Sequence, residues 1–184
     1  MKKPLVFDND CISSFSWINR LDILEILFPN EILVPEAVNI ELSKMIHSKK
    51  YSYVYSNIEH LIINGLIIVK DIPVTSKMAQ EYLSLIDMSN PKRIGRGEAA
   101  SIVLAKNLGG TLASNNLRDI LPHIKNGAPP FICTDEILYL YHKKGLMSID
   151  DGKKIWAQMK QCGRKLPSYD FDMVVHRFDN NISR

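Results

Sequence analysis

The sequence has few cysteines, little net charge and no long hydrophobic run, and each shortage excludes a class of protein. Its three cysteines are scattered along 184 residues and form no Cys-x-x-Cys or Cys/His pattern, which disfavours a zinc site. No apolar stretch is long enough to span a bilayer. The apolar run behind the first residues stops at Asp8, which is far too short for the core of a signal peptide. We therefore expect a cytoplasmic protein that makes no use of a membrane.

The composition is that of an ordinary globular domain. Hydrophobic residues make up 46% of the chain and charged residues 23%, and there is no repeat, linker or low-complexity tract. This length favours one domain with a real core. The net charge of +3 is compatible with a nucleic-acid substrate but does not argue for one.

Short apolar strands alternate with helical patterns along the chain, which is typical of a parallel α/β sheet. We expect the polar and aromatic tail after Pro167 to be loosely held. The spacing predicts strands over residues 4–8, 31–34, 66–69, 111–114 and 131–133. It predicts helices over residues 10–27 (one or two), 35–45, 57–63, 78–86, 95–108, within 115–124, over 135–144, and over 150–161 with Asp150 or Asp151 as the N-cap.

Several acidic residues occupy positions where a buried or sheet-end residue is expected. Asp8 directly follows the first strand, with Asp10 two residues on, and ligand sites in such sheets lie just beyond the carboxyl ends of strands. Glu41 shares a helix face with apolar residues, and Glu98 lies in the first turns of its helix. An uncompensated carboxylate on a buried face is costly, so such acids are normally paired, capped or metal-bound. A simpler interpretation exists for each acid. Glu41 would be a half-exposed acid at the edge of an apolar stripe, and Glu98 would lie in the first turn because acidic side chains are favourable at a helix N-terminus.

Amides follow the fourth strand, where Asn115 and Asn116 come directly after Ser114. Asp119 lies one helical turn beyond Asn115, so the two side chains face one cleft if the segment is helical.

Basic residues occur close to the candidate acids. Lys92, Arg93 and Arg96 shortly precede Glu98, and they either hold substrate phosphates or form a solvated loop that offsets the acids. Residues 49–55 alternate basic and aromatic side chains, which suits base stacking, but a packed connector is the favoured interpretation.

The chain resembles the PIN-domain nucleases, particularly VapC-like toxin ribonucleases. The matching residues are Val6-Phe7-Asp8-Asn9-Asp10, Val34 to Leu42, Gly95-Arg96-Gly97-Glu98-Ala99-Ala100-Ser101-Ile102 and Leu112 to Asn116. The motifs keep their order from about Pro4 to Met147, which implies a PIN-like nuclease domain over residues 1–147. Residues 148–184 then form a C-terminal helix and tail, packed on that domain or trailing from it.

The resemblance implies a three-layer α/β/α fold with a central parallel sheet, and an acidic Mg²⁺ or Mn²⁺ pocket that cleaves RNA. It also implies a small antitoxin protein as a partner, and a homodimer. By position, the implied catalytic residues are Asp8, Glu41, Glu98 and Asp119. The metal ligands are Asp8, Asp10, Glu98, Asn115 and Asp119, and the substrate-binding residues are Lys92, Arg93 and Arg96.

The family often has one or two acids after the fourth strand, where this chain has Asn115 and Asn116. An amide keeps an oxygen ligand but removes a charge, so we expect a weaker, manganese-favouring site, with Asp119 and Asp10 compensating.

Two other functions fit parts of the pattern. A hydrophobic strand followed by Asp-x-Asp also opens the phosphatases of haloacid-dehalogenase type, where the first Asp is a nucleophile. That family has no role for the Gly-Glu-Ala helix. A catalytically inactive PIN-like module that binds RNA or protein is the other alternative.

Overall fold

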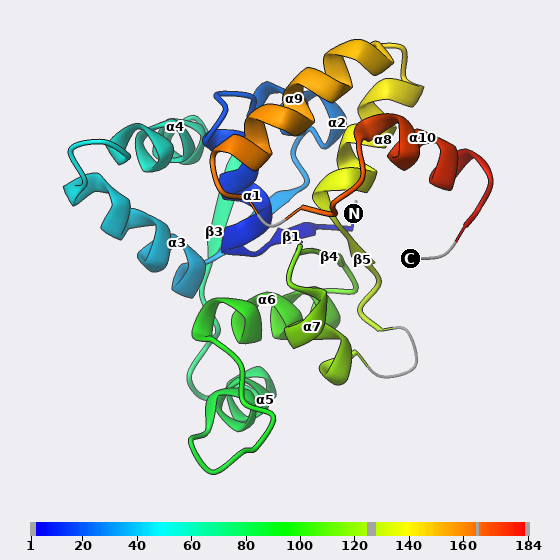
Figure 1. Ribbon diagram of the computed structural model, residues 1–184. Coiled ribbons are helices and arrows are strands. Elements are labelled where there is room, and N and C mark those ends of the chain that lie inside the picture. The colour runs from blue at the N-terminus through cyan, green and yellow to red at the C-terminus, as the bar shows by residue number, and fades with distance from the viewer. Residues whose placement is uncertain (1–2, 125–127, 165, 183–184) are drawn as a thin grey trace.

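The protein is built around a five-stranded, all-parallel sheet with strand order β3-β2-β1-β4-β5 (Figure 1). The computed structural model describes residues 3–124, 128–164 and 166–182. The prediction of a parallel sheet flanked by helices is confirmed. The strands are β1 Leu5–Phe7, β2 Ile32–Pro35, β3 Ile67–Lys70, β4 Thr111–Ala113 and β5 Phe131–Ile132.

Alternating side chains of the strands enter two separate cores. Leu5 and Phe7 of β1 face the larger core, which α1, α2, α3, α4, α8, α9 and α10 complete, whereas Val6 faces a smaller one against α6 and α7. Helices therefore cover both faces of the sheet and make three layers (Figure 1). The helices are α1 Asn9–Ser16, α2 Asp22–Leu27, α3 Glu36–Ser43, α4 Ser52–Ile63, α5 Lys77–Ile86, α6 Arg96–Asn107, α7 Leu117–Ile120, α8 Thr134–Lys143, α9 Ile149–Gln161 and α10 Phe171–Asp179.

Several helix starts differ from the sequence-based expectation, most of all that of α4, which begins at Ser52 and not at residue 57. Pro35 ends β2 and caps α3, because its extended ψ of 145° keeps it outside the helix. Helix α9 begins at Ile149, and its N-cap is Ser148, not Asp150 or Asp151. The Ser148 hydroxyl accepts the backbone N–H of Asp151 at 3.1 Å, which satisfies a donor of the first turn.

The basic and aromatic stretch is packed rather than extended into solvent. Tyr51 lies 4.6 Å from Trp17 between ring centroids, the Tyr53 hydroxyl donates to the Trp17 carbonyl at 3.0 Å, and Tyr55 is buried. These contacts join the start of α4 to the end of α1.

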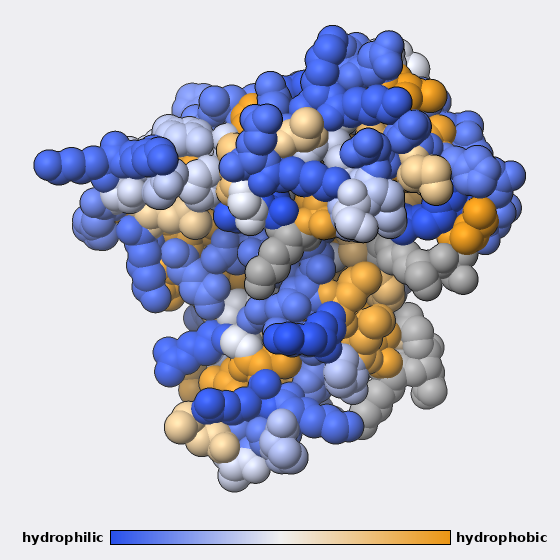
Figure 2. Space-filling view, in the orientation of Figure 1, coloured by the Kyte–Doolittle hydropathy of each residue, from blue (hydrophilic) through white to orange (hydrophobic). Residues whose placement is uncertain are grey.

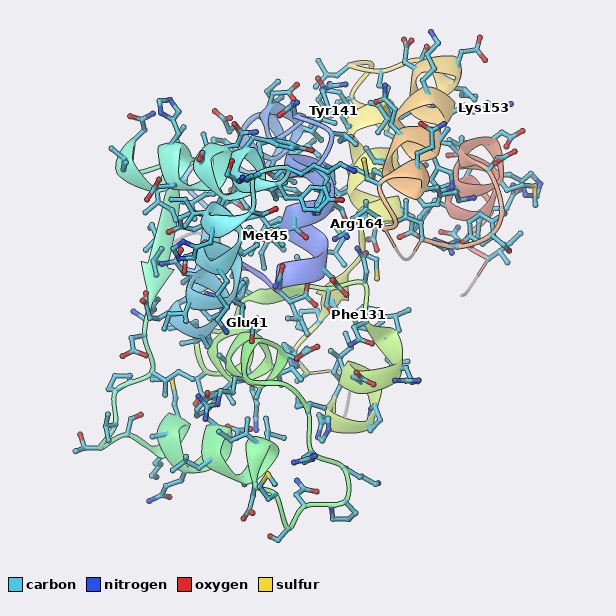
Figure 3. The ribbon with its side chains drawn as sticks, turned by 60° about the vertical axis from the view of Figure 1, so that its left-hand side comes forward. Glu41, Met45, Phe131, Tyr141, Lys153 and Arg164 are labelled. Atoms are coloured by element: carbon cyan, nitrogen blue, oxygen red, sulfur yellow. The ribbon has the colours of Figure 1, made fainter. Side chains whose placement is uncertain are left out.

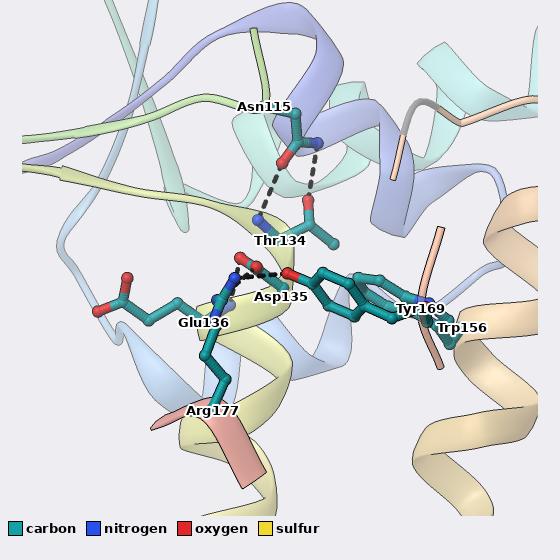
Figure 4. Close-up of polar contacts among 7 residues, drawn as sticks. All are labelled: Asn115, Thr134, Asp135, Glu136, Trp156, Tyr169 and Arg177. Carbon is teal, nitrogen blue, oxygen red and sulfur yellow. Dashed lines mark hydrogen bonds and ion pairs between the residues drawn. The ribbon is translucent and has the colours of Figure 1, made fainter. Parts of the chain in front are cut away.

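The C-terminal tail is firmly held, contrary to the expectation of a loose segment. Phe171 and Val174 of α10 are fully buried, and their spacing of three residues gives the helix one apolar face. Arg177 forms an ion pair with Asp135 of α8 at 2.8 Å, where the two side chains are only 12% and 2% exposed (Figure 4). The pair fastens α10 to the domain.

No helix among residues 3–124, 128–164 and 166–182 is long and apolar enough to cross a membrane. Figure 2 shows hydrophilic side chains over most of one face, which is indented between the part with α9 and the part with α6.

Candidate functional site

Asp8 is a buried carboxylate at the carboxyl end of the central strand β1. It caps α1, where one carboxylate oxygen accepts the Cys11 N–H at 2.8 Å and the other accepts the hydroxyl of Ser114, which follows β4. Burial raises the pKa of Asp8 from 3.8 to about 7, against the lowering effect of these two hydrogen bonds. The negative charges of Asp10 and Glu98 raise it further. A cation beside Asp8 would offset both the cost of burying its charge and the repulsion from Asp10 and Glu98.

Two glycines at the start of α6 make room for two carboxylates. A β-carbon on Gly95 would collide with the Glu98 carboxylate, and one on Gly97 would lie 2.9 Å from a Glu41 oxygen. The Gly97 N–H donates to the other Glu41 oxygen at 3.2 Å, so Glu41 reaches from α3 to the positive end of α6 (Figure 3). Asn9 donates to Glu41 at 3.5 Å. The two glycines of the Gly-x-Gly-Glu motif therefore leave the space that the Glu98 and Glu41 carboxylates occupy.

The side chain of Asn116 forms hydrogen bonds with two more carboxylates. Its amide nitrogen donates to Glu98 at 3.2 Å and to Asp119 at 2.8 Å, so that nitrogen lies between the two acids. The Asn116 backbone N–H donates to the Ser114 hydroxyl at 3.2 Å, which links this group to Asp8. Asp119 also pairs with Arg118 at 3.2 Å on the surface of α7.

Asn115 points to the other side of the chain. Its amide nitrogen donates to the Thr134 hydroxyl and its oxygen accepts the Thr134 N–H, both at 2.9 Å, at the start of α8 (Figure 4). The nitrogen also approaches the Asp10 carbonyl at 3.5 Å. With both amide atoms engaged there, it is Asn116 whose amide contacts the acids. The roles predicted for Asn115 and for the half-buried Asp10 as metal ligands stay predictions.

Three arginines line a cavity of about 630 Å³ next to this group, namely Arg93, Arg96 and Arg118, together with Asp119. Lys92 is exposed and is not among the lining residues. The cavity has the charge that a phosphate-bearing ligand requires.

The donor set suits a hard divalent cation. Among the described residues, no three histidine, cysteine or acidic side chains gather closely enough to form a metal site by themselves. Magnesium is usually held by one or two carboxylates together with waters. Glu98 and Asp119 could supply these two carboxylates. Both accept a hydrogen bond from the Asn116 amide nitrogen, so the space between them is one where positive charge is favourable. If the Asn116 amide group is rotated by 180°, its oxygen takes the place of the nitrogen and can act as a metal ligand.

A family model described as a PIN domain matches residues 4–120, more than half of the chain. The chain belongs to the PIN-domain family. The family resemblance predicted from the sequence is thereby confirmed, and it supports a nuclease-type enzyme acting on nucleic acid. PIN-domain nucleases typically use divalent metals. A search of curated proteins finds no match.

Sequence reasoning did not assign a role to several residues of this PIN domain. Ser114 and Asn116 flank the predicted Asn115, and only the fold shows that the Ser114 hydroxyl donates to Asp8 and the Asn116 amide donates to Glu98. Arg118 could have been predicted from the sequence, because it directly precedes the candidate Asp119. Arg164 and Arg177 lie beyond Met147, where the motifs of the resemblance end, so no motif pointed to them.

Proposed function

We propose that this PIN-domain protein is a divalent-metal-dependent ribonuclease. The observation that carries the proposal is the arrangement of Glu98 and Asp119 around the Asn116 amide, joined through Ser114 to the buried Asp8. Glu98 and Asp119 would hold Mg²⁺ or Mn²⁺, with Asn116 as an oxygen donor, and the Asp8 carboxylate would add negative charge nearby. When bound, such an ion supplies a water of lowered pKa and stabilises charge on a phosphate.

The residues of the chain supply positioning and charge around that point. The arginine-lined cavity binds phosphates beside the acids, and Glu41 orders the start of α6 through the Gly97 N–H. Burial raises the pKa of Asp8 to about 7 in the metal-free protein, and a cation bound nearby would lower that pKa and keep the carboxylate ionised. The amide in place of an acid removes one negative charge, which favours Mn²⁺ over Mg²⁺ at equal concentration. Regulation by a small antitoxin, and a homodimer, extend the proposal from the resemblance to VapC-like toxins.

The test is incubation with mixed end-labelled RNAs in Mg²⁺, Mn²⁺ or EDTA. We expect metal-dependent cleavage that falls about a hundredfold or more in Glu98→Gln, since one charged ligand is lost. Asp150→Asn, which changes an exposed acid on α9, is the matched control and should leave the rate unchanged.

Cleavage that survives EDTA, or that is equal in Glu98→Gln and Asp150→Asn, would refute the site. Hydrolysis of p-nitrophenyl phosphate without RNA cleavage would favour the phosphatase alternative. RNA binding without any cleavage would favour the inactive module.

A further inference from the structure

A second cavity lies on the other side of the acidic residues, and a C-terminal arginine forms part of it. The cavity measures about 100 Å³ and is lined by Asp10, Ser14, Asn115, Gly163 and Arg164. Sites for a base or a drug-sized ligand take about 300 Å³ or more, so this space suits a much smaller group. Arg164 follows α9 and lies outside residues 4–120, which the family model matches.

Arg164 is held in a fixed position over α1 (Figure 3). Its guanidinium carbon lies 4.9 Å from the centroid of the Trp17 ring, and one of its terminal nitrogens donates to the Ser13 hydroxyl at 3.4 Å. Tyr51 packs on Trp17 in turn. A stacked arginine loses little further freedom when it binds an anion, because its planar fork is already oriented.

The guanidinium is not fully used by these contacts. Within the described part of the chain, the buried Arg164 Nε has no hydrogen-bond partner, and neither has Nε1 of the adjoining Trp17. A buried donor without a partner is costly, and a purely structural clamp would gain nothing from leaving it so. Nε itself is covered, so an anionic oxygen in the cavity would accept from a terminal nitrogen of the Arg164 guanidinium.

The two cavities are connected to the acids Asp8, Glu98 and Asp119 through two consecutive residues, Asn115 and Asn116. Asn115 lines the Arg164 cavity, whereas Asn116 contacts Asp119, which lines the cavity of Arg93, Arg96 and Arg118. Both amides follow Ser114, the partner of Asp8. Positive charge therefore lies on both sides of the carboxylates.

We infer that Arg164 forms a phosphate subsite and that a single nucleic-acid strand lies across the acidic group, with backbone phosphates at Arg164 on one side and at the three-arginine cavity on the other. A polynucleotide carries a phosphate on each side of the bond to be cut, which matches this charge pattern. The inference rests on the proposed function, since it places the strand at that site.

The test measures binding separately from cleavage. A fluorescein-labelled RNA octamer is titrated by anisotropy in EDTA, over a range of salt concentrations, with wild type, Arg164→Ala and Arg164→Lys. Lys154→Ala is the matched control, because it removes a cation from an exposed pair on α9. We expect Arg164→Ala to weaken binding about tenfold through loss of a charge-assisted contact. Its log–log salt dependence should fall by about 0.7, the value for one phosphate of a single strand. Arg164→Lys should keep the salt dependence.

Arg164→Ala also removes the stacking on Trp17 and so lowers stability, and a second measurement therefore uses the wild-type protein. The Arg164 Nε–H signal in a ¹⁵N spectrum, assigned by its absence in Arg164→Lys, should shift when the octamer binds. An unshifted signal during binding, equal behaviour of Arg164→Ala and Lys154→Ala, or no octamer binding by wild type at low salt would each overturn the subsite.

The outcomes also separate the two proposals. Metal-dependent cleavage with an Arg164 variant that matches the control leaves the proposed function standing and removes the subsite. Arg164-dependent binding without cleavage by the wild type does the reverse.

Discussion

Replacing Asp8 by asparagine should stabilise the metal-free protein at neutral and alkaline pH. The pKa of Asp8 rises from 3.8 to about 7 on folding, chiefly because the side chain is buried. The folded state therefore holds this proton more tightly than the unfolded chain. The stabilising effect of protonation is complete below pH 3.8 and is lost as the pH rises through 7.

The size of the effect follows from the pKa shift. At about 1.4 kcal/mol for each pKa unit, ionisation of Asp8 costs the wild type about 4 kcal/mol above pH 7. Asparagine does not ionise and still caps α1, but it loses one acceptor for the Ser114 hydroxyl, which costs about 1 kcal/mol at every pH. We expect Asp8→Asn to be more stable than wild type by about 3 kcal/mol at pH 8. The two stabilities should cross near about pH 4.5.

The measurement is urea denaturation in EDTA from pH 4 to 8.5, with Asp150→Asn as the control for a change of net charge. Adding Mn²⁺ at pH 8 should stabilise wild type by about 2.7 kcal/mol at a hundredfold excess over Kd, and Asp8→Asn by much less. A difference between wild type and Asp8→Asn that does not change with pH would refute the reasoning.

Two further substitutions test neighbouring features. Gly97→Ala places a β-carbon against Glu41, so RNA cleavage should fall about tenfold or more while the thermal midpoint changes little; full activity would show that the close approach is not needed. Arg177→Met removes the cation that pairs with the buried Asp135 carboxylate, which should cost about 3–5 kcal/mol in urea denaturation. Lys143→Met, in an exposed pair, should cost under about 1 kcal/mol, and equal losses in the two variants would contradict this account.

The sequence by itself predicted a parallel α/β sheet, and it singled out Asp8, Glu41 and Glu98 as candidate acids. The alternation of apolar runs with helical spacing depends on neighbours a few residues apart, so it can be recognised along the chain. The motif Gly95-x-Gly97-Glu98 could be recognised for the same reason. Its physical basis appears only in the structure, where the two glycines leave space for Glu98 and Glu41.

Tertiary structure decided which of two adjacent amides contacts the acids. Asn115 and Asn116 are chemically identical, and no local spacing distinguishes them. Thr134, at the start of α8, engages both amide atoms of Asn115, which leaves Asn116 for Glu98 and Asp119. That choice depends on a residue 19 positions away in the chain.

The C-terminal residues show the same limit more strongly. Arg164 reaches Ser13 across 151 positions, and Arg177 reaches Asp135 across 42. The apolar spacing of Phe171 and Val174 marks α10 as amphipathic, but it does not say against which surface the helix packs. Only the folded chain brings these cations to their partners, because long-range contacts depend on how whole helices pack rather than on the spacing of residues within one helix.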